Sequence, residues 1–155
     1  MEEFRIGQLT KELVAIKLQK MSDPCAAAAE LVQKTLSLAL KGLSPNDPGL
    51  DRLIADACRG GITGLLLADQ NLAKGAVLIL EVVAELASEF NLDPAQAMKG
   101  ALHGLADLHR FVQPEQIYDI THRIEANFMG AGEAFSQILG EIKQTQSGSR
   151  EESNL

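Results

Sequence analysis

Six acidic and histidine side chains of this sequence have the chemistry of metal ligands. They are Glu81, Glu85, His103, Asp107, Asp119 and His122. The di-iron sites of helical bundles need a carboxylate from each of two helices and a Glu-x-x-His pair from each of two others. The sequence contains no Glu-x-x-His, and its nearest spacings are Asp119-x-x-His122 and His103-x-x-x-Asp107. We therefore predict no metal site and no cofactor.

The spacing of these side chains favours contact with solvent. His103 and Asp107 stand four residues apart on one polar stripe, which is the arrangement of a solvated i,i+4 pair. Glu81 and Glu85 lie within the apolar stretch 75–87, where carboxylates have the best chance of a perturbed pKa. Since they form a narrow polar stripe on a helical pattern, we interpret them as a solvent-facing edge.

The sequence lacks the patterns of nucleophilic and nucleotide-binding enzymes. It has no G-x-S-x-G nucleophile elbow, and its glycines at 60, 61 and 64 fall within a helical pattern instead of following a strand. Cys25 and Cys58 lie outside any C-x-x-C spacing and are interpreted as small buried side chains. We predict that the protein is not an enzyme.

Charge and hydropathy limit the partners. The chain has 155 residues and a net charge of −7, and its basic residues are scattered singly. Nucleic acid is not an expected partner, because binding it requires clustered Lys and Arg. The most apolar stretch, 75–87, is too short to span a bilayer, and the N-terminus has no apolar signal region. We expect a cytoplasmic protein without a membrane span.

Helical periodicity dominates the chain, and no convincing alternation of period two is present. Turn residues and X-Pro steps, such as Asp23-Pro24 and Asp93-Pro94, mark the helix starts. The predicted helices cover about residues 2–20, 24–41, 48–69, 71–90, 94–111 and 114–143. This pattern predicts an all-α fold, a compact bundle of five to six antiparallel helices forming a single domain over residues 1–143.

Three finer features follow from the same pattern. Residues 144–155 are polar and are predicted to be a disordered tail. Gly130 and Gly132 predict a bend inside the last helix. The helix over 71–90 has the narrowest polar stripe, so we predict that it is the most buried element.

Two pairs of glycines interrupt helical segments, in ACRGGITGLLLAD (57–69) and in AMKGALHGLADLH (97–109). Glycine weakens a helix by about 1 kcal/mol relative to alanine, so these positions need a reason. Glycines four residues apart share one helix face and let another backbone approach closely. That approach is either a crossing inside the bundle or a contact with a second subunit. Gly60, Gly64, Gly100 and Gly104 are therefore candidate interface residues.

Broad apolar faces on the helices over 24–41 and 71–90 predict a homodimer or another homo-oligomer. We expect a non-enzymatic interaction or scaffold protein of the bacterial cytoplasm, acting on a protein partner through apolar and Gly/Ala-rich helix faces. One alternative is an amphipathic protein of a granule or lipid surface. Another is a bundle that binds a metal or small ligand through the six acidic and histidine residues.

Overall fold

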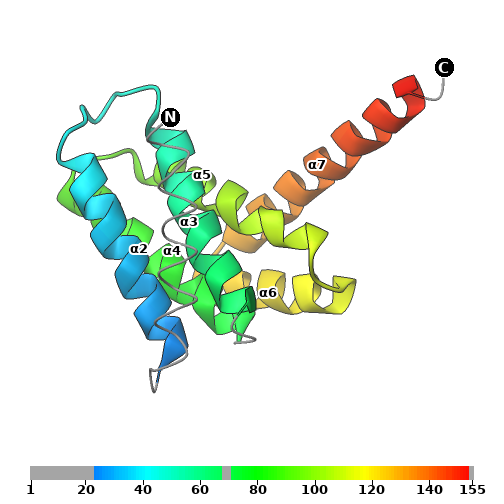
Figure 1. Cartoon of the computed structure of the whole chain (residues 1–155), viewed down its shortest axis with the longest axis horizontal. Coiled ribbons are helices and arrows are strands. Elements are labelled where there is room, and N and C mark those ends of the chain that lie inside the picture. The colour runs from blue at the N-terminus through cyan, green and yellow to red at the C-terminus, as the bar shows by residue number, and fades with distance from the viewer. Residues whose placement is uncertain (1–22, 68–70, 154–155) are drawn as a thin grey trace.

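The computed structural model describes residues 23–67 and 71–153 and shows them as an all-α bundle (Figure 1). Its helices are α2 (Pro24–Leu40), α3 (Leu50–Leu67), α4 (Leu72–Glu89), α5 (Pro94–Ala106), α6 (Pro114–Asn127) and α7 (Ala131–Ser153). The 3-10 helix η1 (Asp107–Arg110) follows α5, so the α-helix ends earlier than predicted. The helix predicted over residues 2–20 lies outside the described part of the chain. Among the helices described, none has the length and apolar content needed to cross a membrane.

Side-chain caps explain where the helices begin. Asp23, Asn71 and Asp93 each accept a hydrogen bond from a backbone N–H of the first helical turn, at 3.2, 3.1 and 3.0 Å. Proline follows the cap of α2 and of α5, at a position where the missing N–H leaves no hydrogen bond unmade. The helix starts predicted at these residues are confirmed.

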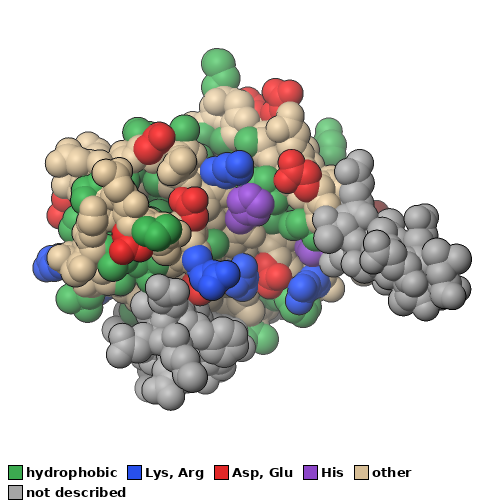
Figure 2. Space-filling view, turned by 90° about the horizontal axis from the view of Figure 1, so that it is seen from above, with side chains coloured by type: hydrophobic (Ala, Val, Ile, Leu, Met, Phe, Trp, Pro, Cys, Tyr) green, Lys and Arg blue, Asp and Glu red, His purple; other side chains and the backbone are tan. Residues whose placement is uncertain are grey.

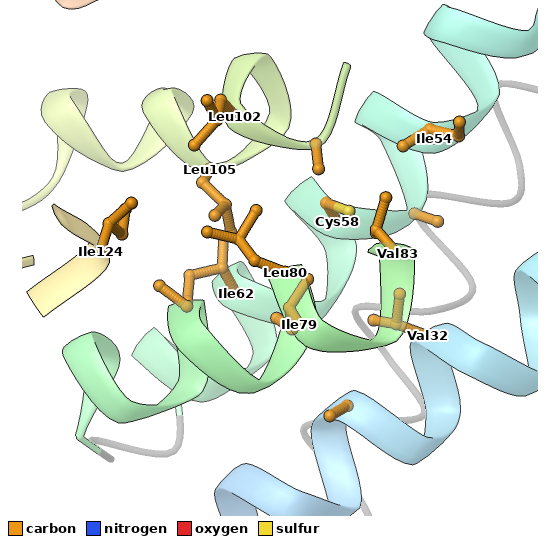
Figure 3. Close-up of a cluster of buried hydrophobic side chains, with 14 of the residues drawn as sticks. Val32, Ile54, Cys58, Ile62, Ile79, Leu80, Val83, Leu102, Leu105 and Ile124 are labelled. Carbon is orange, nitrogen blue, oxygen red and sulfur yellow. The ribbon is translucent and has the colours of Figure 1, made fainter. Parts of the chain in front are cut away.

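Helix α4 lies at the centre, in contact with α2, α3, α5 and α6. In Figure 3, Ile79 and Leu80 of α4 meet Ile62 of α3 and Leu105 of α5, and all four are fully buried. The prediction that α4 is the most buried element is wrong by a small margin. Eleven residues of α3 are buried and ten of α4, although both helices have 18 residues. At Gly61 of α3, a Cβ would meet Val32 of α2 at 2.5 Å and Ile79 of α4 at 3.3 Å, so both helices pack closely on it.

The two cysteines are free and buried, as predicted. Burial raises the pKa of the Cys58 thiol to about 12. Cys25 also has a raised pKa, chiefly because of burial, and its Sγ donates a hydrogen bond to the carbonyl oxygen of Asn71 at 3.3 Å. Both thiols therefore serve as packing groups, since the reactive species of cysteine is the thiolate.

The single helix predicted over residues 114–143 is wrong, because the predicted bend is a complete break between α6 and α7. Gly130 has a φ of 88° there, a conformation that L side chains rarely adopt. Helix α7 then continues to Ser153, where the sequence predicted a disordered tail from residue 144. In Figure 1 this part of α7 points away from the bundle. Low hydrophobicity does not stop a helix, because extending a formed helix costs little compared with nucleating one.

Candidate functional site

The six candidate metal ligands are spread over α4, α5, η1 and α6. Glu81 and Glu85 are exposed on α4, and His103 is exposed on α5. Asp119 and His122 are exposed on α6. Within residues 23–67 and 71–153, no three His, Cys, Asp or Glu side chains gather in a way that could hold a metal ion. These residues do not form a common site in the described structure.

Asp107 takes part in an ion-pair network with arginines. Its carboxylate lies 3.9 Å from Nε of Arg59 and 3.6 Å from Nε of Arg110, and Arg59 also pairs with Asp56 at 2.8 Å. The network joins α3 to η1 at the molecular surface. On the face seen in Figure 2, acidic, basic and histidine side chains are interspersed. These pairs are partly open to solvent, and solvent screening keeps the contribution of such pairs to stability small.

The glycine pair of α5 lies against the backbone of α3. A Cβ atom on Gly100 would stand 3.2 Å from the carbonyl oxygen of Asp51. One on Gly104 would overlap the carbonyl oxygen of Ala55 and stand 3.0 Å from its carbonyl carbon. Asp51 and Ala55 have the same four-residue spacing as the glycines, so one turn of each helix fits against the other. Of the two alternatives that the glycine spacing left open, the glycines of α5 take part in a close helix crossing inside the bundle.

The glycine pair of α3 does not face the pair of α5. At about 100° per residue, Gly60 lies roughly 140° around α3 from Ala55, on a different side of the helix. Gly60 and Gly64 are nevertheless buried, as are Gly100 and Gly104. None of the four candidate interface glycines is therefore exposed to a second subunit in this structure.

Two apolar depressions of the described surface lie on either side of α7. One, which we name the α6–α7 groove, has a volume of about 690 Å³ and lies between α6, η1 and α7. Its apolar lining is formed by Val112, Pro114, Ile117, Tyr118 and Leu139. Tyr118 is 74% exposed, and its ring stacks on that of His122 with centroids 6.2 Å apart.

Small residues form the α7 side of this groove. Gly132, Ser136 and Gly140 line it at intervals of four residues, and therefore share one helix face. Gly132 sits close to α6, since a Cβ there would lie 2.9 Å from the carbonyl oxygen of Thr121. At Gly140, by contrast, a Cβ would meet no atom within 4 Å. The groove is thus narrow beside the turn and open further along α7.

The second depression, the α5–α7 groove, also has a volume of about 690 Å³. Its apolar lining includes Met98, Leu102, Phe128, Met129 and Ile138. Met129 is 97% exposed at the turn between α6 and α7. Methionine side chains are flexible and common on surfaces that accept varied partners. Together with the α6–α7 groove, this depression gives α7 an apolar groove on each side.

Glu125 holds the turn that separates these grooves. Its carboxylate accepts hydrogen bonds from the backbone N–H groups of Gly130, Gly132 and Glu133 at 2.8, 3.1 and 3.3 Å. These bonds, that from Gly130 foremost, hold the pKa of the Glu125 carboxyl below its ordinary value. The carboxylate of Glu125 also lies at the N-terminus of α7, where the positive end of the helix dipole favours a negative charge.

We expect the Glu125→Gln substitution to lower the thermal midpoint at neutral pH and to leave it nearly unchanged in acid. Because the folded-state pKa of Glu125 is lowered, its stabilising effect is fully present above the ordinary value of 4.5. The effect is lost as the pH falls through the folded-state pKa. Thermal unfolding followed by circular dichroism between pH 3 and 7 measures the difference. Glu81→Gln, at an exposed glutamate of α4, is the control; an equal shift in both variants would contradict the capping role.

Among the residues that line the α6–α7 groove, the sequence singled out His122 alone, and only as a weak metal-ligand candidate. The signal that could have indicated this groove is the four-residue spacing of Gly132, Ser136 and Gly140. It was not recognised because residues 114–143 were interpreted as one continuous helix. A groove between two helices requires the chain to break and fold back, and one continuous helix has no such surface. Comparison of the chain with protein-family models, with curated proteins and with solved structures finds no match.

Proposed function

We propose that this protein is a non-enzymatic interaction module that binds a helix of a protein partner in the α6–α7 groove. The observation that carries the proposal is the groove itself, with its apolar lining and the exposed ring of Tyr118. Amphipathic helices bind in such grooves through apolar side chains at positions i, i+3 or i+4, and i+7. Exposed apolar surface of this kind is typical of interaction sites.

The small residues of α7 support a helix as the ligand. A helix can approach closely where a neighbouring helix presents small side chains at four-residue intervals. Ser136 and Gly140 are exposed at that spacing, whereas Gly132 is already packed against α6. The space around Gly140 leaves room for an apolar side chain of the ligand. The polar groups Glu125, Glu133 and Lys143 are exposed at the margin, so a ligand can fill the apolar part of the groove without burying them unpaired.

The proposal includes three features expected from the sequence: action without catalysis, a cytoplasmic location and homo-oligomer formation through apolar helix surfaces other than the α6–α7 groove. It moves the expected contact surface from the four glycines to the grooves beside α7, because those glycines are buried. We also propose that α6 and α7 form an antiparallel hairpin, consistent with the position of Gly132 beside Thr121.

The test is a substitution that fills the groove without altering the fold. Gly140→Leu places a side chain where a Cβ meets no atom within 4 Å. The probe is a fluorescent 14-residue amphipathic peptide, stapled to hold it helical, with leucines on one face, glutamates in its first turn and lysines in its last turn. We expect the full chain to bind it in the micromolar range and Gly140→Leu to weaken binding at least about tenfold, since filling the groove removes the apolar contacts.

Gly42→Leu is the matched control, because Gly42 is exposed in the turn after α2 and does not line this groove. A Cβ there would meet only the carbonyl oxygen of Ala39, at 3.9 Å. It should bind the peptide as the unmodified protein does. Thermal unfolding checks that both variants remain folded. No binding to the unmodified protein, or equal binding to Gly140→Leu, would overturn the proposed function.

A further inference from the structure

The α6–α7 groove carries opposite charges at its two ends. Glu125 and Glu133 lie beside the turn, where α6 ends and α7 begins. Lys143 lies ten residues further along α7 than Glu133, which corresponds to about 15 Å of helix. On the other wall, Pro114 stands eleven residues before Glu125, so Pro114 and Lys143 both line the part of the groove that is far from the turn.

We propose that the partner helix carries basic side chains at the end that contacts Glu125 and Glu133, and acidic side chains at the end that contacts Lys143. This inference rests on the function proposed above and names the chemistry and orientation of the ligand. A groove of about 15 Å matches three helical turns, so both charged ends of one ligand helix can be engaged at once. The apolar residues between them pack on Ile117, Tyr118 and Leu139.

The charges of the groove suit a helix better than a lipid. Helices commonly carry acidic residues in the first turn and basic residues in the last turn, which complements their dipole. Such a helix satisfies both ends of the groove when its last turn lies beside Glu125 and Glu133. A lipid presents one headgroup, and an anionic headgroup at Lys143 would leave the two glutamates without a cation.

The charged and titratable groups that face the ligand come from three elements. Glu125 and His122 belong to α6, Glu133 and Lys143 to α7, and His109 to η1. His109 contacts the carbonyl oxygen of Ala106 through Nδ1 at 2.9 Å, and His122 stacks on Tyr118. Of these groups, the two glutamates lie near the turn and Lys143 lies at the opposite end.

The experiment reverses these charges in the full-length protein and measures binding of the same peptide probe. At 50 mM salt we expect Lys143→Glu and Glu133→Lys each to weaken binding about fivefold, and 0.5 M salt to remove the difference. A second peptide with its glutamates and lysines exchanged, stapled like the first to hold both helical, should bind the unmodified protein more weakly. It should bind the Glu133→Lys/Lys143→Glu double variant, in which both ends are changed, more tightly than the first peptide does. Lys34→Glu, at an exposed lysine of α2, is the control and should change nothing.

The outcomes separate this inference from the proposed function. If Gly140→Leu abolishes binding while neither charge reversal changes it, the inferred charge pattern is overturned and the groove remains the binding site. If Gly140→Leu has no effect, the proposed function itself fails. Sedimentation of the full chain as a dimer that Gly140→Leu converts to a monomer would assign the groove to a second copy and overturn the proposal of a separate partner.

Discussion

Replacement of Gly104 by alanine is expected to lower the free energy of unfolding by at least about 2 kcal/mol. A single methyl group is added, but it would overlap the carbonyl oxygen of Ala55 on α3 and lie 3.1 Å from the Cα atom of that residue. These atoms belong to the backbone of a packed helix, so α3 and α5 must separate to admit the methyl group. Urea denaturation followed by circular dichroism at 222 nm measures the change.

Gly140→Ala in α7 is the matched control for this substitution. Both changes replace glycine by alanine inside a helix, which on helix propensity alone stabilises by up to about 1 kcal/mol. The Cβ added at Gly140 meets no atom within 4 Å, so that variant should gain stability while Gly104→Ala loses it. Equal effects at the two positions would show that α5 does not depend on backbone contact with α3.

Replacement of Phe135 by alanine is expected to cost about 3–5 kcal/mol of the free energy of unfolding. Phe135 is fully buried on α7, which packs against α5 and α6. Removing the ring exchanges its buried apolar contacts for a cavity that the surrounding helices can fill only in part. Since whole domains are stable by about 5–15 kcal/mol, this change should bring α7 and its grooves close to unfolding.

Phe111→Ala provides the comparison, because Phe111 is 58% exposed at the end of η1. We expect this variant to lie within about 1 kcal/mol of the unmodified protein, as surface substitutions usually do. The groove-binding peptide supplies a second readout, since loss of α7 packing should abolish binding in Phe135→Ala. A Phe135→Ala variant as stable as Phe111→Ala would contradict the packing of α7 described here.

Local sequence was sufficient for the helices whose ends are set by neighbouring residues. The caps at Asp23 and Asp93 act within their own first turn, so their effect is readable from a few consecutive residues. The same reasoning failed at residues 128–130. A helix-breaking glycine there looked like a bend, because the apolar spacing of residues 117–142 continues across it. The carboxylate of Glu125, which stabilises the break, contacts residues up to eight positions away.

The glycine spacing shows the limit of inference from one helix. It indicated that another backbone approaches Gly100 and Gly104, and the approach is present. It did not indicate that the facing residues are Asp51 and Ala55, because helical periodicity describes the face of one helix and carries no information about its neighbour. The two glycine pairs look alike in the sequence, and their spacing could not show that the pair of α3 and the pair of α5 have different neighbours.

The sequence by itself determined an aliphatic all-α chain with capped helices, buried thiols and glycines that need close neighbours, since these depend on residue type and short-range spacing. Only the tertiary structure decided that the candidate metal ligands lie on separate helix surfaces. It also decided that α7 packs against α6 and that an apolar groove lies between them. The physical reason is that a groove belongs to two helices at once, and its shape follows from how they pack against the rest of the bundle.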